Sequence, residues 1–128
     1  MNVLSSQLQD HDLSLDSSRP FQPGAIVLLT LTNPREKFWG VLLNVDLIGV
    51  SFQGIDLSSF EDALNTIVDG ESALGNTLFF PMHRIERLEL DLPDGSIPSL
   101  SQRFEARTGV PPARLLGAGN AAVRSSGA

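Results

Sequence analysis

The chain contains no cysteine among its 128 residues. Disulfide bonds and thiolate metal sites are therefore excluded, which fits a reducing compartment. Its only imidazoles are those of His11 and His83, and neither has an Asp/Glu pair at helical spacing beside it. We therefore expect no zinc site and no cofactor. Neither a G-x-S-x-G element nor a phosphate-binding glycine loop occurs, so no catalytic residue is predicted and we expect a protein that is not an enzyme.

Long apolar runs are also absent. The longest, Ala25–Leu31, is interrupted by Thr30 and is far too short to span a bilayer. The first ten residues, MNVLSSQLQD, lack the cationic start and the apolar centre of a secretory signal. We expect a soluble chain that does not enter a membrane, with a cytoplasmic location.

The net charge of −6 gives no long-range attraction to a phosphate backbone. The charges are nevertheless unevenly distributed. Residues 54–76 contain acids and no Lys or Arg, whereas residues 101–128 contain four arginines and one acid. A solvated surface is the simplest interpretation of both segments. A C-terminal tail that binds anions such as nucleic acid is the alternative.

Short segments rich in β-branched and aliphatic residues recur between Phe21 and Leu92. They are separated by turn formers such as Pro-Gly and Asn-Pro. We predict strands at Ala25–Thr32, Lys37–Val45, Val50–Gln53, Thr77–Phe80 and Arg84–Leu92. Five short strands at this spacing predict a mainly β domain, a small barrel, over residues 21–92.

A helix is predicted at about residues 58–69, between the third and fourth strands. Ser58 and Ser59 are candidate N-caps with acids three residues on, and Gly70 is a candidate C-terminal stop. One helical face carries the apolar residues Phe60, Leu64, Ile67 and Val68. We expect this helix to lie across an open end of the barrel with its acids outward.

The flanks of the barrel are predicted to be simpler. Residues 1–20 are polar without a sustained period and are expected to be flexible. Residues 93–116 should form a C-terminal helical extension, with a helix from near Pro98 to Gly109 and a short turn ending near Leu116. Residues 117–128 are small and polar, and we expect disorder there.

A two-part pattern stands out within the predicted barrel. Gly40 is followed six residues later by Asp46, and Ile48, Val50 and Phe52 then alternate with other residues. Glycine inside a strand indicates a bend or a close backbone approach, and Asp46 is typical of a turn residue that accepts from nearby N–H groups. About thirty residues later, Ile85 and Leu88 are three apart, which breaks the strand period and predicts a one-turn jog that starts at Pro81.

This pattern resembles the Sm-like superfamily, including its Hfq-like bacterial members. The resemblance implies an Sm/SH3-like barrel in which Gly40, Asp46 and Ile85 are motif residues. It implies RNA contacts by His83, Ile48 and Arg84. Two departures weaken RNA binding, because Met82 stands where the family has a lysine and Ile48 where it has a stacking aromatic. The poor N-terminal helix and the helical insertion are further departures.

The resemblance also implies a homo-oligomeric ring in which strand four of one subunit pairs with strand five of the next. The interface would contain Leu78, Phe79, Phe80 and Leu88. An apolar edge such as Leu78–Phe80 needs a partner or a cover. Cover by the N-terminal segment or by the acidic helix would instead leave a monomer.

Two other functions remain open. An SH3-like module for protein–protein interaction would use the acidic helix and the basic tail to choose its partner. A PilZ-like barrel that binds cyclic dinucleotides is similar only at Asp46–Gly49 and lacks the paired arginines. Phe38 and Trp39 are adjacent and face opposite sides of a strand, so we expect one in the core and the other exposed or at an interface.

Overall fold

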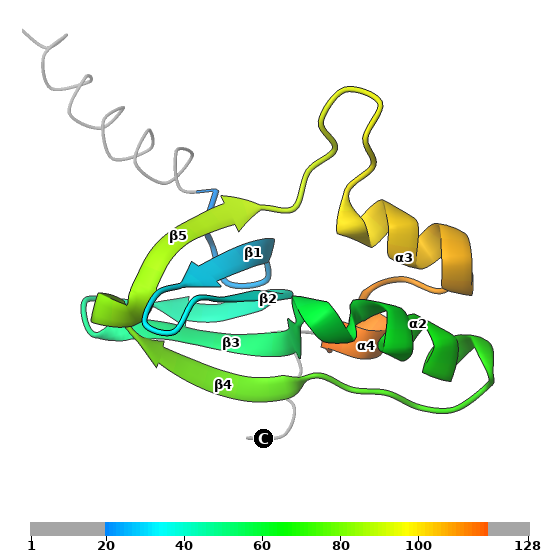
Figure 1. Ribbon diagram of the computed structural model, residues 1–128, viewed down its shortest axis with the longest axis horizontal. Coiled ribbons are helices and arrows are strands. Elements are labelled where there is room, and N and C mark those ends of the chain that lie inside the picture. Colours follow the sequence, from blue (N-terminus) through cyan, green and yellow to red (C-terminus); the bar gives the residue numbers. More distant parts are fainter. Residues whose placement is uncertain (1–19, 118–128) are drawn as a thin grey trace, which may run out of the picture.

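Within residues 20–117, which the computed structural model describes, five antiparallel strands form one sheet in the order β4-β3-β2-β1-β5 (Figure 1). Each strand overlaps one predicted from the sequence. Their bounds are β1 Ile26–Leu31, β2 Glu36–Val45, β3 Gly49–Asp56, β4 Asn76–Pro81 and β5 Ile85–Leu90. The flexibility expected for residues 1–20 and the disorder expected for residues 117–128 fall almost wholly outside the described residues.

The sheet does not close into the predicted barrel. Strands β4 and β5 are both edges in the pairing of residues 20–117, and a single 3-10 turn, η2 (Met82–Arg84), joins them. This turn is the predicted jog, and it directs β5 onto β1 instead of back onto β4. Side chains fill the concave side of the sheet, where the rings of Phe38 and Phe80 lie 5.0 Å apart. Phe80 of β4 and Leu88 of β5 pack against the same inner core, so apolar packing, in place of a closing ladder, connects the two edge strands.

The sheet has a hydrophobic core on each face. The inner core contains Val27, Leu29, Leu31, Leu42, Val50 and Phe52. The outer core contains Trp39, Val41, Phe60, Leu64, Phe104, Leu115 and Leu116, so it joins the sheet to the helices. Because both faces are covered, β1 reads as a continuous apolar run instead of an alternating one.

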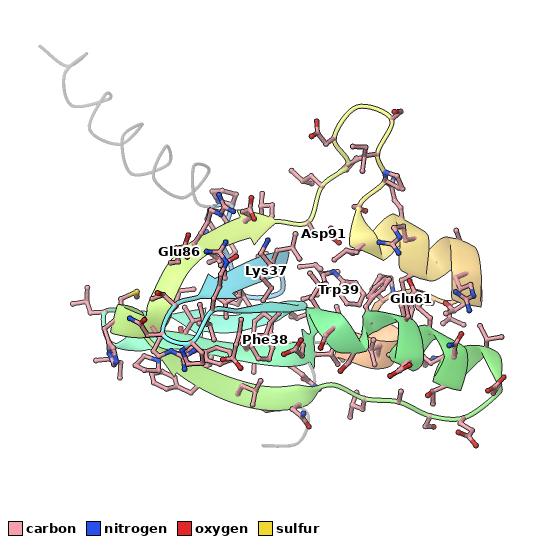
Figure 2. The ribbon with its side chains drawn as sticks, in the orientation of Figure 1. Lys37, Phe38, Trp39, Glu61, Glu86 and Asp91 are labelled. Carbon is pink, nitrogen blue, oxygen red and sulfur yellow. The ribbon has the colours of Figure 1, made fainter. Side chains whose placement is uncertain are left out.

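Phe38 and Trp39 show the effect of these two cores (Figure 2). They face opposite sides, as predicted, but the expectation that one would be exposed or at an interface is wrong. Trp39 is fully buried in the outer core, and Phe38 packs against the inner core.

The helices gather at one end of the sheet, and the β2–β3 turn and η2 lie at the opposite end (Figure 1). Helix α2 spans Phe60–Val68 after a 3-10 turn, η1 (Leu57–Ser59), and lies between β3 and β4. Helices α3 (Leu100–Thr108) and α4 (Ala113–Leu116) follow β5. Phe60 and Leu64 bury the apolar face of α2 against the outer core.

The two main helices begin differently. Ser99 and Gln102 form a reciprocal capping box at the start of α3, which therefore begins just after the expected Pro98. Ser59 is the N-cap residue of α2, as one of the two candidates predicted, whereas Asp56 takes the capping role before η1. Asp56 accepts from the Ser58 N–H at 2.8 Å, and within the described chain the Ser59 side chain makes no capping hydrogen bond. An aspartate that precedes the serines already satisfies the first turn.

Candidate interaction surface

The two halves of the sequence pattern are neighbours at the end of the sheet away from the helices. The Met82 N–H of η2 donates to the carbonyl of Ile48 in the β2–β3 turn at 2.9 Å. Asp46 Oδ1 accepts from the backbone N–H groups of Ile48 at 2.9 Å and Gly49 at 3.3 Å. The turn role predicted for Asp46 is therefore confirmed. Its carboxylate fixes the turn that presents Ile48 to solvent.

Gly40 occupies the close backbone approach that its place in a strand predicts. It pairs with Gly54 of β3, and a Cβ at position 40 would lie 2.3 Å from the Gln53 carbonyl oxygen and 2.7 Å from the Gly54 Cα. Both obstacles are backbone atoms. Only glycine is compatible with this close approach of the paired strands β2 and β3.

The Arg84 side chain binds backbone and side-chain oxygens of the segment 32–36. Its Nε donates to the Thr32 carbonyl at 2.9 Å, and its Nη2 donates to the Pro34 carbonyl and to Glu36 Oε1, both at 3.0 Å. Thr32 and Pro34 lie in the turn between β1 and β2, and Glu36 is the first residue of β2. The guanidinium that the resemblance assigns to RNA therefore anchors a turn about fifty residues earlier in the chain.

The other residues assigned to RNA remain at the surface. His83 is exposed, and its ring has no hydrogen-bond partner within residues 20–117. Ile48 is 70% exposed. Ile85, a motif residue, packs against the inner core. Ile48 therefore lies beside η2, and the exposed side chains there are mostly aliphatic.

An exposed apolar area covers this end of the molecule, and we call it the end patch. Leu47 is 94% exposed at the tip of the β2–β3 turn, and Phe79 of β4 is 50% exposed. The Phe79 ring lies against Gly49, because a Cβ there would be 2.5 Å from Phe79 Cζ. The end patch consists of Val45, Leu47, Ile48, Phe79 and Met82. Exposed apolar areas of this kind mark interaction sites.

The sequence predicts only part of the end patch. It indicates Ile48 and Phe79 as contact residues and Met82 only as a departure from the family pattern, and it gives no role to the side chains of Val45 and Leu47. The available signal was the pair of aliphatic residues in the β2–β3 turn, a position where polar residues and glycine are usual.

The four predicted interface residues separate into two groups. Phe80 and Leu88 pack against the inner core, so their side chains support the fold. Leu78 is half-buried on the same face as Phe80, and Phe79 points to the other face, where it joins the end patch. Phe79 is therefore the member of the group most available to a partner.

The outer edge of β4 carries unpaired backbone groups. The Met82 bond to Ile48 makes that pair a hydrogen-bonded one, and bonded and non-bonded pairs alternate along an antiparallel ladder. Phe80 and Leu78 therefore direct their backbone groups to β3, and Thr77 and Phe79 direct theirs outward. Within residues 20–117, no other segment pairs with this edge.

The acidic and basic segments partly neutralise each other. Glu61 of α2 accepts from Arg103 at 3.0 Å and from Arg107 at 3.3 Å, both from α3. The Arg103 guanidinium also lies 5.1 Å from the centre of the Phe60 ring. Two of the four arginines that could have formed an anion-binding tail therefore pair with Glu61 of α2, while Arg124 lies outside the described residues.

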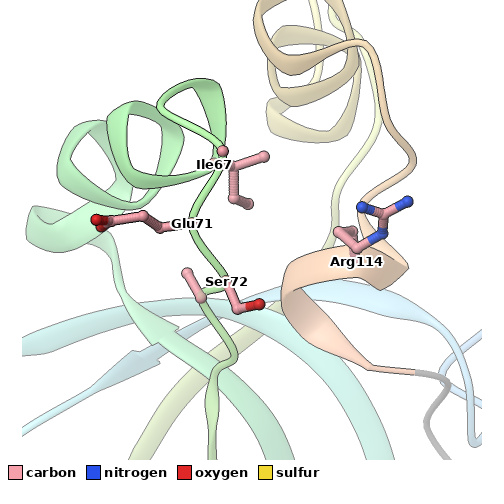
Figure 3. Close-up of a pocket in the computed structure, with 6 residues that line it drawn as sticks. Ile67, Glu71, Ser72 and Arg114 are labelled. Atoms are coloured by element: carbon pink, nitrogen blue, oxygen red, sulfur yellow. The ribbon is translucent and has the colours of Figure 1, made fainter.

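A small cavity of about 160 Å³ lies between the end of α2 and α4 (Figure 3). Ser72 points toward Arg114 across it, and Glu71 points away. Glu71, the acid that lines this cavity, therefore does not face Arg114. In the described part of the chain, no cluster of three His, Asp or Glu residues is placed to hold a metal ion.

No helix formed by residues 20–117 is long and apolar enough to cross a membrane.

Comparisons of the chain with protein-family models, with curated proteins and with solved structures give no match.

Proposed function

We propose that this chain is a non-enzymatic assembly domain that self-associates through edge strand β4. Kinship with Sm-like proteins is part of the proposal and rests on the pattern of Gly40, Asp46 and Ile85. The cytoplasmic location expected from the sequence also belongs to it. The observation that carries the proposal is the condition of β4, which contains no charged side chain and whose outer edge pairs with no other strand formed by residues 20–117.

An open edge of this kind is an unstable surface in water. Its outward N–H and C=O groups form a template for another strand, and natural edges are normally protected by charges, proline or a bulge. Over residues 72–82 the sequence SALGNTLFFPM has no charged residue, and Pro81 stands only at the end of the strand. The exposed Phe79 adds apolar area that a partner would bury.

RNA binding is not favoured by the geometry. Arg84 is bound to the β1–β2 turn, and the turn residue that would stack on a base is the aliphatic Ile48. Base stacking and cationic contacts carry most of the binding to single strands. We therefore assign the end patch to protein contact.

Light scattering after size exclusion tests the proposal. The wild-type chain should have a mass above that of one chain at micromolar concentration. Phe79→Glu should shift it to the monomer without unfolding it, because Phe79 lies outside both cores. Val68→Glu is the matched control, since Val68 of α2 is 52% exposed and lies at the helical end. Circular dichroism and the emission of Trp39, the single tryptophan, report folding.

A strictly monomeric wild-type chain would overturn self-association. The SH3-like alternative would then apply, in which β4 and the end patch take a strand of a different protein. Unfolding of the Phe79→Glu monomer would show instead that Phe79 belongs to the core.

A further inference from the structure

We infer that the partner of β4 is β4 of a second copy, paired antiparallel across a two-fold axis, and not β5 of a neighbouring copy in a ring. This inference rests on the self-association proposed above and names its geometry. It follows from a difference between the two open edges of the sheet.

Edge strand β5 carries protection against pairing. Its sequence IERLEL includes Glu86, Arg87 and Glu89, and Glu86 already pairs with Arg35 at 3.1 Å. The register between β1 and β5 also shifts between Thr30 and Leu31, so Glu86 has no partner in the ladder. Charges and an irregular register are devices by which natural sheets prevent an edge from accepting another strand.

Edge strand β4 has a regular ladder. It pairs with β3 over all six residues, Asn76–Pro81, without a register shift. Because β4 contains no charged residue, pairing it with another strand would bury no unpaired charge of its own. In a ring, each β4 would face the charged β5 of its neighbour, and Leu78 and Phe79 offer no counter-charge. Against a second β4, the same uncharged surface meets itself.

The outward backbone groups of β4 match a two-fold pairing about Phe79. In that register Phe79 faces Phe79 of the second copy, and the two residues exchange N–H to carbonyl bonds. Thr77 then faces Pro81 of the second copy. Its N–H donates to the Pro81 carbonyl, while the missing N–H of Pro81 lies at the end of the pairing.

Side chains fit this register as well. The two Phe79 rings become cross-strand neighbours on the outer face, where aromatic pairs are stabilising. Leu78 faces Phe80 of the second copy on the inner face. The same patch serves both copies, which is the property of an isologous dimer, the commonest homo-oligomer.

A charge-swap experiment separates the two geometries. Phe79→Lys and Phe79→Glu are prepared separately, and each is measured by sedimentation velocity alone and after mixing in equal amounts. In the two-fold geometry like charges face each other in each variant alone, so dimerisation should weaken about tenfold or more. The mixture should recover the dimer, because a lysine then faces a glutamate. Val68→Lys and Val68→Glu, alone and mixed, are the matched controls and should behave as the wild type.

The outcomes are distinct. A wild-type dimer with recovery on mixing supports the two-fold geometry. A wild-type assembly larger than a dimer, or no recovery on mixing, overturns the two-fold geometry but leaves self-association intact. A wild-type monomer overturns both proposals. Thr77→Pro is a second test, because it removes a backbone N–H that points away from β3. The two-fold geometry predicts that this variant is a folded monomer. A variant that remains a dimer would contradict that geometry.

Discussion

The indole N–H of Trp39 donates a hydrogen bond to Asp91 Oδ2 at 3.0 Å, which connects the centre of β2 to the segment that precedes α3 (Figure 2). The same carboxylate accepts from the N–H groups of Leu100 at 2.9 Å and Ser101 at 2.8 Å, and from the Ser101 hydroxyl. Asp91 therefore caps α3 and satisfies the polar atom of Trp39, the largest fully buried side chain in the described part of the chain.

Removing the Asp91 carboxylate should lower the stability of the fold. Asp91→Ala leaves the buried indole N–H without an acceptor and frees the first turn of α3, so we expect the free energy of unfolding to fall by about 2–3 kcal/mol. Urea unfolding followed by Trp39 emission measures it. Asp94→Ala, in the exposed loop nearby, should change the stability by less than about 0.5 kcal/mol. Equal losses in both variants would contradict the role given to Asp91.

Arg84 should contribute to stability and not to nucleic-acid binding. Arg84→Met keeps the length of the side chain but removes its donors to Thr32, Pro34 and Glu36, so the free energy of unfolding should fall by about 1–2 kcal/mol. Arg87→Met, at an exposed site, should have little effect. Fluorescence anisotropy with U-rich and A-rich oligonucleotides at low salt should detect no binding by the wild type at micromolar protein. Binding that is lost in Arg84→Met would restore the RNA function implied by the resemblance.

The close approach of the paired strands β2 and β3 at Gly40 should not tolerate an added methyl group. In Gly40→Ala the new Cβ meets backbone atoms of Gln53 and Gly54 that cannot rotate away. We expect loss of cooperative thermal unfolding in calorimetry. Ser51→Ala, on the same pair of strands, should unfold cooperatively. A normal transition in Gly40→Ala would show that the strands can separate at this point.

The contacts of Glu61 with Arg103 and Arg107 should be weak. All three side chains are about half exposed, and exposed ion pairs contribute less than about 1 kcal/mol. Glu61→Gln should therefore lower stability slightly in low salt and hardly at all in 1 M NaCl, where charges are screened over about 3 Å. A large loss of stability would contradict this estimate, and a large loss that persists in high salt would assign it to the hydrogen bonds that the Glu61 carboxylate accepts.

The strands could be predicted because their signals are local. Turn formers precede and follow β1, and the alternation of Ile48, Val50 and Phe52 predicts the strand after Asp46. The jog expected at Pro81 is η2, which begins at the next residue. The spacing of three between Ile85 and Leu88 has a different cause, because both residues lie in β5 and the register with β1 shifts between them.

Features that depend on distant segments could not be predicted in this way. Whether Trp39 is exposed depends on helices α2, α3 and α4, and the direction of Arg84 depends on a turn about fifty residues earlier. Closure of the sheet depends on whether β4 and β5 meet, which no local pattern reports. For the same reason the sequence named the residues of β4 as an interface but did not separate Phe79, which is exposed, from Phe80, which supports the inner core.

The mass of the wild-type chain in solution tests the central claim most directly. Light scattering over a concentration series from about 1 to 100 μM should show a mass of twice the single chain at the upper end, falling toward one chain on dilution. A mass equal to one chain throughout the series would contradict self-association through β4.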